Sequence, residues 1–137
     1  MEELPISTDD FSREEINKAI TQLKINKSPG MDGISAEMLK VVSISTVEWL
    51  HILCNKIWNE GQVTEDWRNG TIVCVPKKGN LTDCDNWRGV ILLSMPGKVY
   101  SQAILNRMRD VVDTQLREEQ AGFRPKRSCA EQIFTLR

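Results

Sequence analysis

Apolar residues near the start of the chain recur at the spacing of an amphipathic α-helix. Ser12 and Glu15 have the spacing of a capping box, in which each side chain satisfies a free backbone amide at the start of a helix. The helix that follows is predicted to end near Lys24. Its predicted apolar face consists of Ile16, Ala19, Ile20 and Leu23.

Two more helices are predicted before the pattern changes. Turn-forming residues fill the segment 26–33, and a short helix over about 35–42 is expected after it. Ser45 and Glu48 form a second pair with capping-box spacing, and the helix that they would start is predicted to end at Gly61. The apolar face of this helix consists of Val47, Leu50, Cys54, Ile57 and Trp58.

Short β-branched runs replace the helical pattern in the second half of the chain. The run 71–75 predicts a strand, which Pro76 stops because proline has no amide hydrogen to donate. A polar loop, 77–86, comes next, and 88–93 predicts a second strand. The two strands are expected to pair as an antiparallel hairpin.

A long helix is predicted beyond the hairpin, after Pro96 and Gly97 interrupt the chain once more. Another helix is expected to begin near Cys129 and is still running at Arg137, so the chain is expected to be truncated. The predicted apolar face of the long helix consists of Ser101, Ile104, Leu105, Met108, Val111 and Val112.

The chain is one domain long, and its charge is unevenly distributed. Residues 1–66 contain 6 basic and 12 acidic residues, which gives a charge of −6. Residues 67–137 contain 12 basic and 7 acidic residues, which gives +5, so the net charge of the whole chain is −1. A basic half can attract phosphate by long-range Coulomb attraction, although solvated protein faces often carry such charge.

Several classes of protein and site are excluded. No apolar run reaches the ~18–20 residues that span a bilayer, and the acidic lead-in 1–10 has no signal-peptide core. No C-x-x-C pair is present and His51 is the only histidine, so no zinc site is expected. Asp83 and Asp85 resemble a metal-binding pair, but no third carboxylate supports them. We therefore expect no metal site, and reduced thiols in an intracellular protein whose compartment, nucleus or cytoplasm, stays undetermined.

Three stretches could contact phosphate groups. Lys77 and Lys78 end one predicted strand and Arg88 begins the next, an arrangement that suits a triphosphate but also a solvated hairpin edge. The segment 28–33 could present backbone amides to a phosphate or connect two helices. The segment 120–128 combines cations with one aromatic ring, as in sites for single-stranded nucleic acid, or is an exposed linker.

Six motifs in order resemble the N-terminal region of the reverse transcriptase domain of non-LTR (LINE-type) retrotransposons. The resemblance covers about residues 11–137 and becomes specific through the order and spacing of the motifs. They read F-S-x-x-E-I-x-x-A-I, K-S-P-G-M-D-G-I, W-R-x-G-x-I-V-x-V-P-K-K-G-N, N-W-R-G-V-I-L-L-S, G-K-V-Y-S-Q-A-I-L-N-R-M and Q-A-G-F-R-P-K-R-S.

This resemblance implies an α+β fold, with several helices and a hairpin, that forms the fingers and the start of the palm of a right-hand polymerase. Residues 11–115 would be the fingers region and 116–137 the truncated start of the palm. Lys77 or Lys78 would contact the γ-phosphate side of an incoming deoxynucleoside triphosphate, and Arg88 its α-phosphate and base. Template or backbone contacts are implied for Lys27, Ser28, Gly30, Lys98, Arg107, Gly122, Phe123 and Arg124.

The resemblance also implies what the chain lacks. Many relatives have proline where this chain has Gly89, which bears on the stiffness of the loop. The catalytic aspartates that hold two Mg²⁺ ions in the intact polymerase are absent, so no catalytic residue is assigned and this chain alone is expected to be inactive. Its expected partners are template RNA, a DNA primer, a deoxynucleoside triphosphate and the missing palm and thumb, with no membrane. Alternatives are a non-catalytic RNA-binding module and an inert remnant of a decayed element.

Overall fold

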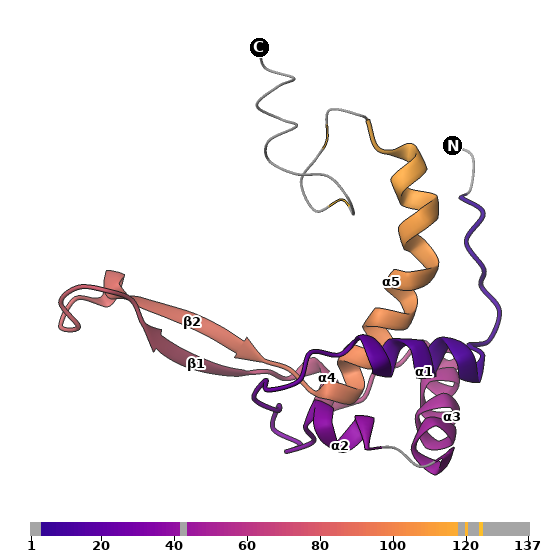
Figure 1. Cartoon of the computed structure of the whole chain (residues 1–137), viewed down its shortest axis with the longest axis horizontal. Helices are drawn as coiled ribbons and strands as arrows, with labels where there is room; N and C mark the ends of the chain where they lie inside the picture. Colours follow the sequence, from indigo (N-terminus) through magenta and orange to yellow (C-terminus); the bar gives the residue numbers. More distant parts are fainter. Residues whose placement is uncertain (1–3, 42–43, 118–119, 121–123, 125–137) are drawn as a thin grey trace. The chain divides into compact units, whose positions relative to one another are not determined.

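The computed structural model describes residues 4–41, 44–117, 120 and 124, which form five α-helices, one 3₁₀ turn and a two-stranded antiparallel sheet (Figure 1). The chain divides into two compact units, one of residues 9–104 and the other of residues 1–8 and 105–137, and each is considered by itself. The expected α+β composition is confirmed. No helix in the described part of the chain is both long and apolar enough to cross a bilayer.

The first helix, α1 (Arg13–Gln22), begins with the predicted capping box. The Ser12 hydroxyl accepts a hydrogen bond from the Glu15 amide at 3.2 Å, and the Glu15 carboxylate accepts one from the Ser12 amide at 2.8 Å. The short helix α2 (Ala36–Lys40) is also present, and the Ser35 hydroxyl caps it by accepting from the Met38 amide. Both starts were predictable because each cap joins residues three positions apart.

The third helix, α3 (Ile44–Glu60), corrects one prediction about its start. Ser45 lies inside the helix and is not its cap. Glu48 instead accepts two hydrogen bonds from the Arg13 guanidinium of α1, at 2.5 and 2.8 Å. Such a charge-assisted bidentate pair is stronger than a bond to a neutral amide. The predicted end is confirmed, because Gly61 follows with a φ of +65°.

Two helical features on either side of the hairpin were not predicted correctly. A one-turn helix, α4 (Glu65–Arg68), was missed altogether. Pro96 and Gly97 do not interrupt the chain but lie in the first turn of α5 (Met95–Gln115). Proline is tolerated there because the first turn needs no amide donor, and the Ser94 hydroxyl accepts from the Gly97 amide at 3.3 Å.

The predicted apolar face of the long helix was also wrong at several positions. The buried residues of α5 are Met95, Pro96, Val99 and Ala103, whereas Ser101 is exposed. Leu105 and Met108, which were placed on the apolar face, are 47% and 39% exposed. The first turns of α5 are therefore oriented by contact with other helices, which the periodicity of one helix cannot reveal.

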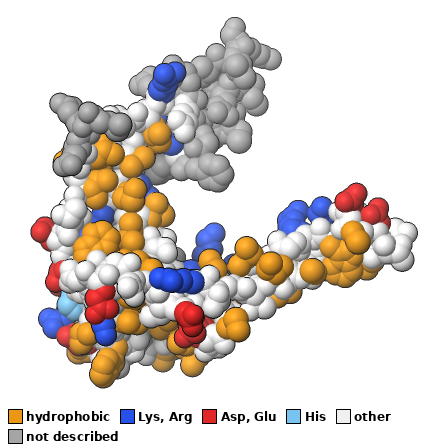
Figure 2. Space-filling view, turned by 180° about the vertical axis from the view of Figure 1, so that it is seen from behind, with side chains coloured by type: hydrophobic (Ala, Val, Ile, Leu, Met, Phe, Trp, Pro, Cys, Tyr) orange, Lys and Arg blue, Asp and Glu red, His pale blue; other side chains and the backbone are white. Residues whose placement is uncertain are grey.

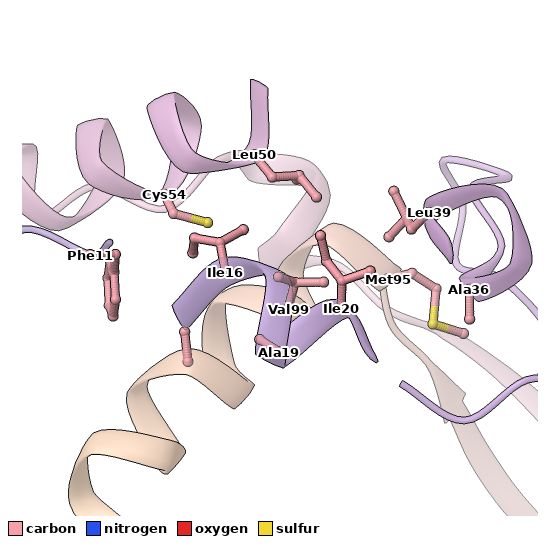
Figure 3. Close-up of a cluster of buried hydrophobic side chains, with 11 residues drawn as sticks. Phe11, Ile16, Ala19, Ile20, Ala36, Leu39, Leu50, Cys54, Met95 and Val99 are labelled. Atoms are coloured by element: carbon pink, nitrogen blue, oxygen red, sulfur yellow. The ribbon is translucent and has the colours of Figure 1, made fainter. Parts of the chain in front are cut away.

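The hydrophobic core of the larger unit lies where α1, α2, α3 and the start of α5 meet (Figure 3). Phe11 is almost fully buried, and its ring makes edge contacts with Trp58 and Tyr100 at centroid distances of 5.2 and 5.9 Å. The other core residues are Ile16, Ala19, Ile20, Ala36, Leu39, Leu50, Cys54, Met95, Val99 and Ala103. The chain leaves this core to form the hairpin and returns to it at Met95.

Candidate nucleotide- and nucleic-acid-binding surface

The hairpin of β1 (Thr71–Pro76) and β2 (Trp87–Leu92) is the element on which the predicted nucleotide contacts lie. Its antiparallel pairing was predicted and is confirmed, with Thr71 opposite Leu92 and Pro76 opposite Trp87. Almost every residue of both strands is exposed. Figure 2 shows hydrophobic side chains along the length of the hairpin, and basic and acidic side chains near its tip.

The register of the two strands decides which side chains share a face. Val75 is paired with Arg88, and the ladder continues past the strands because the Lys77 amide donates to the Asn86 carbonyl at 2.7 Å. Successive side chains of a strand point to opposite faces, so Lys77 lies on the same face as Val75 and Arg88. Lys78 follows in a bend beyond the ladder, so the register does not place it beside Arg88.

The tip of the hairpin, residues 77–87, is held together by its own hydrogen bonds. The Asn86 side-chain amide donates to the Asn80 carbonyl at 2.8 Å, and the Trp87 indole nitrogen donates to the Leu81 carbonyl at 3.1 Å. Gly79 has a φ of +128°, which an L-amino acid rarely adopts. These roles of Asn80 and Asn86 were not predicted from the sequence, although asparagine is frequent where a loop must bond to its own backbone.

The cations at the tip differ in their surroundings. The Lys77 ammonium donates to the Asp85 carbonyl at 2.9 Å, so its side chain folds along the tip. Arg88 is exposed, and its side chain forms no hydrogen bond or ion pair with the residues that the structure describes, although its backbone belongs to the ladder. Lys78 is also exposed. Hence Arg88 can present its planar fork of donors to a ligand without breaking an existing bond.

Asp83 and Asp85 form part of the loop and do not make a carboxylate cluster. The Asp83 carboxylate accepts from the Asp85 amide at 3.1 Å and caps the 3₁₀ turn η1 (Cys84–Asn86). Within the described ranges, no group of three or more His, Cys, Asp or Glu side chains could hold a metal ion. The described residues therefore offer no cluster that fits Mg²⁺, and no chemical step is assigned to a metal among them.

The loop 27–33 combines exposed polar residues with a glycine in close contact with the base of the hairpin. Lys27 and Ser28 are exposed. Gly30 lies against the backbone of Leu93 and Ser94, and a Cβ placed on it would be 2.7 Å from the Ser94 nitrogen. The loop therefore has a packing role at Gly30, in addition to any contact that Lys27 and Ser28 make with nucleic acid.

The remaining predicted contact residues lie on α5 and after it. Lys98 is half-buried in the first turns of α5, in the larger unit. In the smaller unit, Arg107 donates to the Ser7 carbonyl at 3.3 Å. Arg124 forms an ion pair with Asp113 at 2.8 Å and also donates to the Arg117 carbonyl at 2.9 Å. Its guanidinium therefore bonds to the last turn of α5 and to the segment that follows it. Gly122, Phe123 and the last predicted helix lie outside the described residues.

Proteins of mobile elements align with nearly the whole chain. It is 29% identical to an uncharacterised 149 kDa protein of transposon TX1 from Xenopus laevis, over 98% of the chain and 10% of that protein. It is 32% identical to a 115 kDa protein in the type-1 retrotransposable element R1DM of Drosophila melanogaster, over 97% and 13%. It is 25% identical to the RNA-directed DNA polymerase from mobile element jockey of Drosophila funebris, over 96% and 15%.

The chain belongs to the reverse transcriptase family of non-LTR retrotransposons. It spans only 10–15% of the length of these three relatives. No family model matches it. The hairpin of this chain carries exposed cationic side chains of the kind that can contact phosphate groups.

Proposed function

We propose that this chain is the fingers segment of an RNA-directed DNA polymerase with a right-hand architecture, and that it contacts the incoming deoxynucleoside triphosphate and the template RNA. The family assignment supports the polymerase, and the register of the hairpin supports the nucleotide contact. The chain contributes cationic groups that hold and orient a substrate. Bond formation at the primer requires carboxylates and metal ions that are not assigned here.

The observation that carries the proposal is the shared face of Lys77 and Arg88. Counted along the register, they are diagonal neighbours across the hairpin. Diagonal neighbours typically lie about 7–8 Å apart, within reach of each other's long side chains. Two cations so placed can contact different phosphates of one triphosphate, whereas the register does not place Lys78 beside Arg88.

The two side chains differ in what they offer. The Arg88 guanidinium can form two parallel hydrogen bonds to one phosphate, and Lys77 supplies a compact charge. The Asp85 carbonyl, which now accepts from the Lys77 ammonium, is a neutral acceptor. A phosphate oxygen is a stronger acceptor because it is charged. The Lys77 ammonium would therefore release the Asp85 carbonyl and donate to a phosphate oxygen when a triphosphate binds.

Binding of deoxythymidine triphosphate to the 137-residue chain, measured by titration calorimetry, tests this arrangement. A hydrogen bond to a charged group contributes about 1.5–3 kcal/mol, so Arg88→Ala and Lys77→Ala should each weaken binding by about tenfold or more. Lys78→Ala is the matched control, because it removes the same charge from the bend beyond the ladder, and it should change the affinity far less.

Equal losses for all three variants would mean that only net charge matters, and the shared face would have no role. In a polymerase that contains this segment, Arg88→Ala should lower nucleotide incorporation by about 10²-fold, as expected for loss of a preorganised stabilising donor. An unchanged incorporation rate would remove Arg88 from the site.

The template contact is proposed for the exposed pair Lys27 and Ser28. Filter binding of single-stranded RNA over a salt series tests it, because log K falls with log salt by about 0.7 for each phosphate neutralised. Lys27→Ala should reduce this slope by about 0.7, and an unaltered slope would exclude Lys27 from the interface.

A further inference from the structure

Helix α3 has a second apolar face that the core does not use. Its core face includes Leu50, Cys54 and Ile57, all buried. On the adjoining face, Trp49 is 73% exposed and Ile52 is 51% exposed. A helix that packs only against the helices described here needs a single apolar stripe, so a second stripe containing an exposed tryptophan indicates a contact with a protein surface outside this chain.

This second face forms one wall of a groove of about 540 Å³ in the larger unit. Thr46, Trp49, Leu53 and Lys56 lie along that wall, at helical spacing over ten residues. At 1.5 Å per residue the wall is about 15 Å long, or about three turns of helix. The opposite wall consists of Ile34, Leu39, Trp67 and Pro96.

The opposite wall of the groove is held rigidly by contacts with the core. Leu39 and Pro96 are buried. The Trp67 ring lies 5.9 Å from that of Tyr100 and so close to Gly97 that a Cβ there would be 3.1 Å from the indole. The groove is therefore preformed, and a ligand would not have to displace a side chain of the core to enter it.

The charged groups at the edge of the groove indicate which kind of ligand can bind there. Lys56 has a partner already, because its ammonium lies 3.9 Å from the Glu60 carboxylate. The other two charged groups are carboxylates, Asp32 and Asp66, and neither forms an ion pair within the described part of the chain. The Asp32 carboxylate accepts a hydrogen bond from the Ile34 amide at 3.1 Å, which leaves its negative charge in place. A groove lined by two carboxylates and one ammonium is net negative, so it disfavours nucleic acid and favours a ligand with cationic groups beside an apolar surface.

We propose that this groove binds an amphipathic helix of a protein partner, with apolar anchors at i, i+3, i+4 and i+7 and with Lys or Arg beside them. Its length and apolar walls suit the docking of a helix into a groove. An added strand is disfavoured because the walls consist of side chains and offer no open sheet edge. The basic flanks of the helix would meet Asp32 and Asp66.

Two designed helical peptides serve as probes for the full 137-residue chain. Both carry the same stripe of leucine and tryptophan, and the flanking positions are lysine in one peptide and glutamate in the other. Fluorescence anisotropy should show at least tenfold tighter binding of the lysine peptide. Trp49→Asp should abolish this binding, and Asp66→Asn should reduce the preference for lysine.

The matched control is Ile72→Asp, which places the same charge on an exposed apolar residue of the hairpin, since Ile72 is 66% exposed. It should leave peptide binding unchanged, and circular dichroism of each variant verifies that it is folded. Equal affinity for the two peptides, or binding that survives Trp49→Asp, would overturn the proposal. So would self-association of the chain that Trp49→Asp abolishes, because the occupant would then be a second copy.

Discussion

Replacing Gly30 by alanine separates a packing role of the loop 27–33 from a role in nucleic-acid binding. The Cβ of alanine would lie 2.7 Å from the Ser94 nitrogen and 2.8 Å from the Leu93 carbonyl carbon. Both are backbone atoms, which cannot rotate away as the end of a side chain can. The φ of Gly30 is outside the left-handed region, so alanine adds no backbone strain of its own.

The cost follows from the displacement that this contact requires. Ordinary contact begins near 3.4 Å, so the two segments must separate by about 0.7 Å from their present 2.7 Å. Overpacking of this kind typically costs about 1–3 kcal/mol. The movement also disturbs Ser94, whose hydroxyl accepts from the Gly97 amide at the start of α5, and a lost cap costs about 1 kcal/mol.

We therefore expect Gly30→Ala to lower the free energy of unfolding by about 2–4 kcal/mol. Urea unfolding followed by far-UV circular dichroism measures it, and with a slope of about 2 kcal/mol per molar the midpoint should fall by about 1–2 M. Gly89→Ala is the matched control, because its Cβ would meet nothing closer than Ile72 at 3.5 Å. Equal stability of the two variants, with RNA binding weakened only in Gly30→Ala, would refute the packing argument.

Three other properties follow from the structure. Burial raises the pKa of the Cys54 thiol to about 12, so at pH 8 maleimide should modify the exposed Cys74 quickly, and Cys54 only after unfolding, as mass spectrometry of peptides would show. The Arg13 guanidinium holds the pKa of Glu48 below its ordinary value of 4.5. A carboxylate whose pKa is lower in the folded state stabilises the fold at pH values above its unfolded-state pKa. This stabilisation is lost as the pH falls through the folded-state pKa, so the difference in free energy of unfolding between the wild type and Glu48→Gln should vanish in acid. Phe11→Ala should cost about 3–5 kcal/mol in urea unfolding, because Phe11 is buried against two rings, and a smaller loss would contradict that packing.

Local rules were sufficient for several parts of this protein. The cap of α1 joins Ser12 to Glu15, and the hairpin joins neighbouring segments through one loop, so sequence patterns alone predicted both. The order of six short motifs also indicated the family, because motif order does not depend on how the chain folds. The residues that form the cap and the hairpin lie close together in the chain. The family was indicated by motif order, which requires no knowledge of contacts.

Tertiary structure decided what depends on residues far apart in sequence. Glu48 does not form the expected cap of α3, because the guanidinium of Arg13, which is 35 residues away in sequence, donates two charge-assisted hydrogen bonds to it. Gly30 is in close contact with Ser94, and the buried face of α5 is set by the helices it meets. The pairing register separates Lys77 from Lys78, which the sequence treated alike. Periodicity and spacing report on neighbours within a few positions, whereas these outcomes depend on which distant surfaces the folded chain brings together.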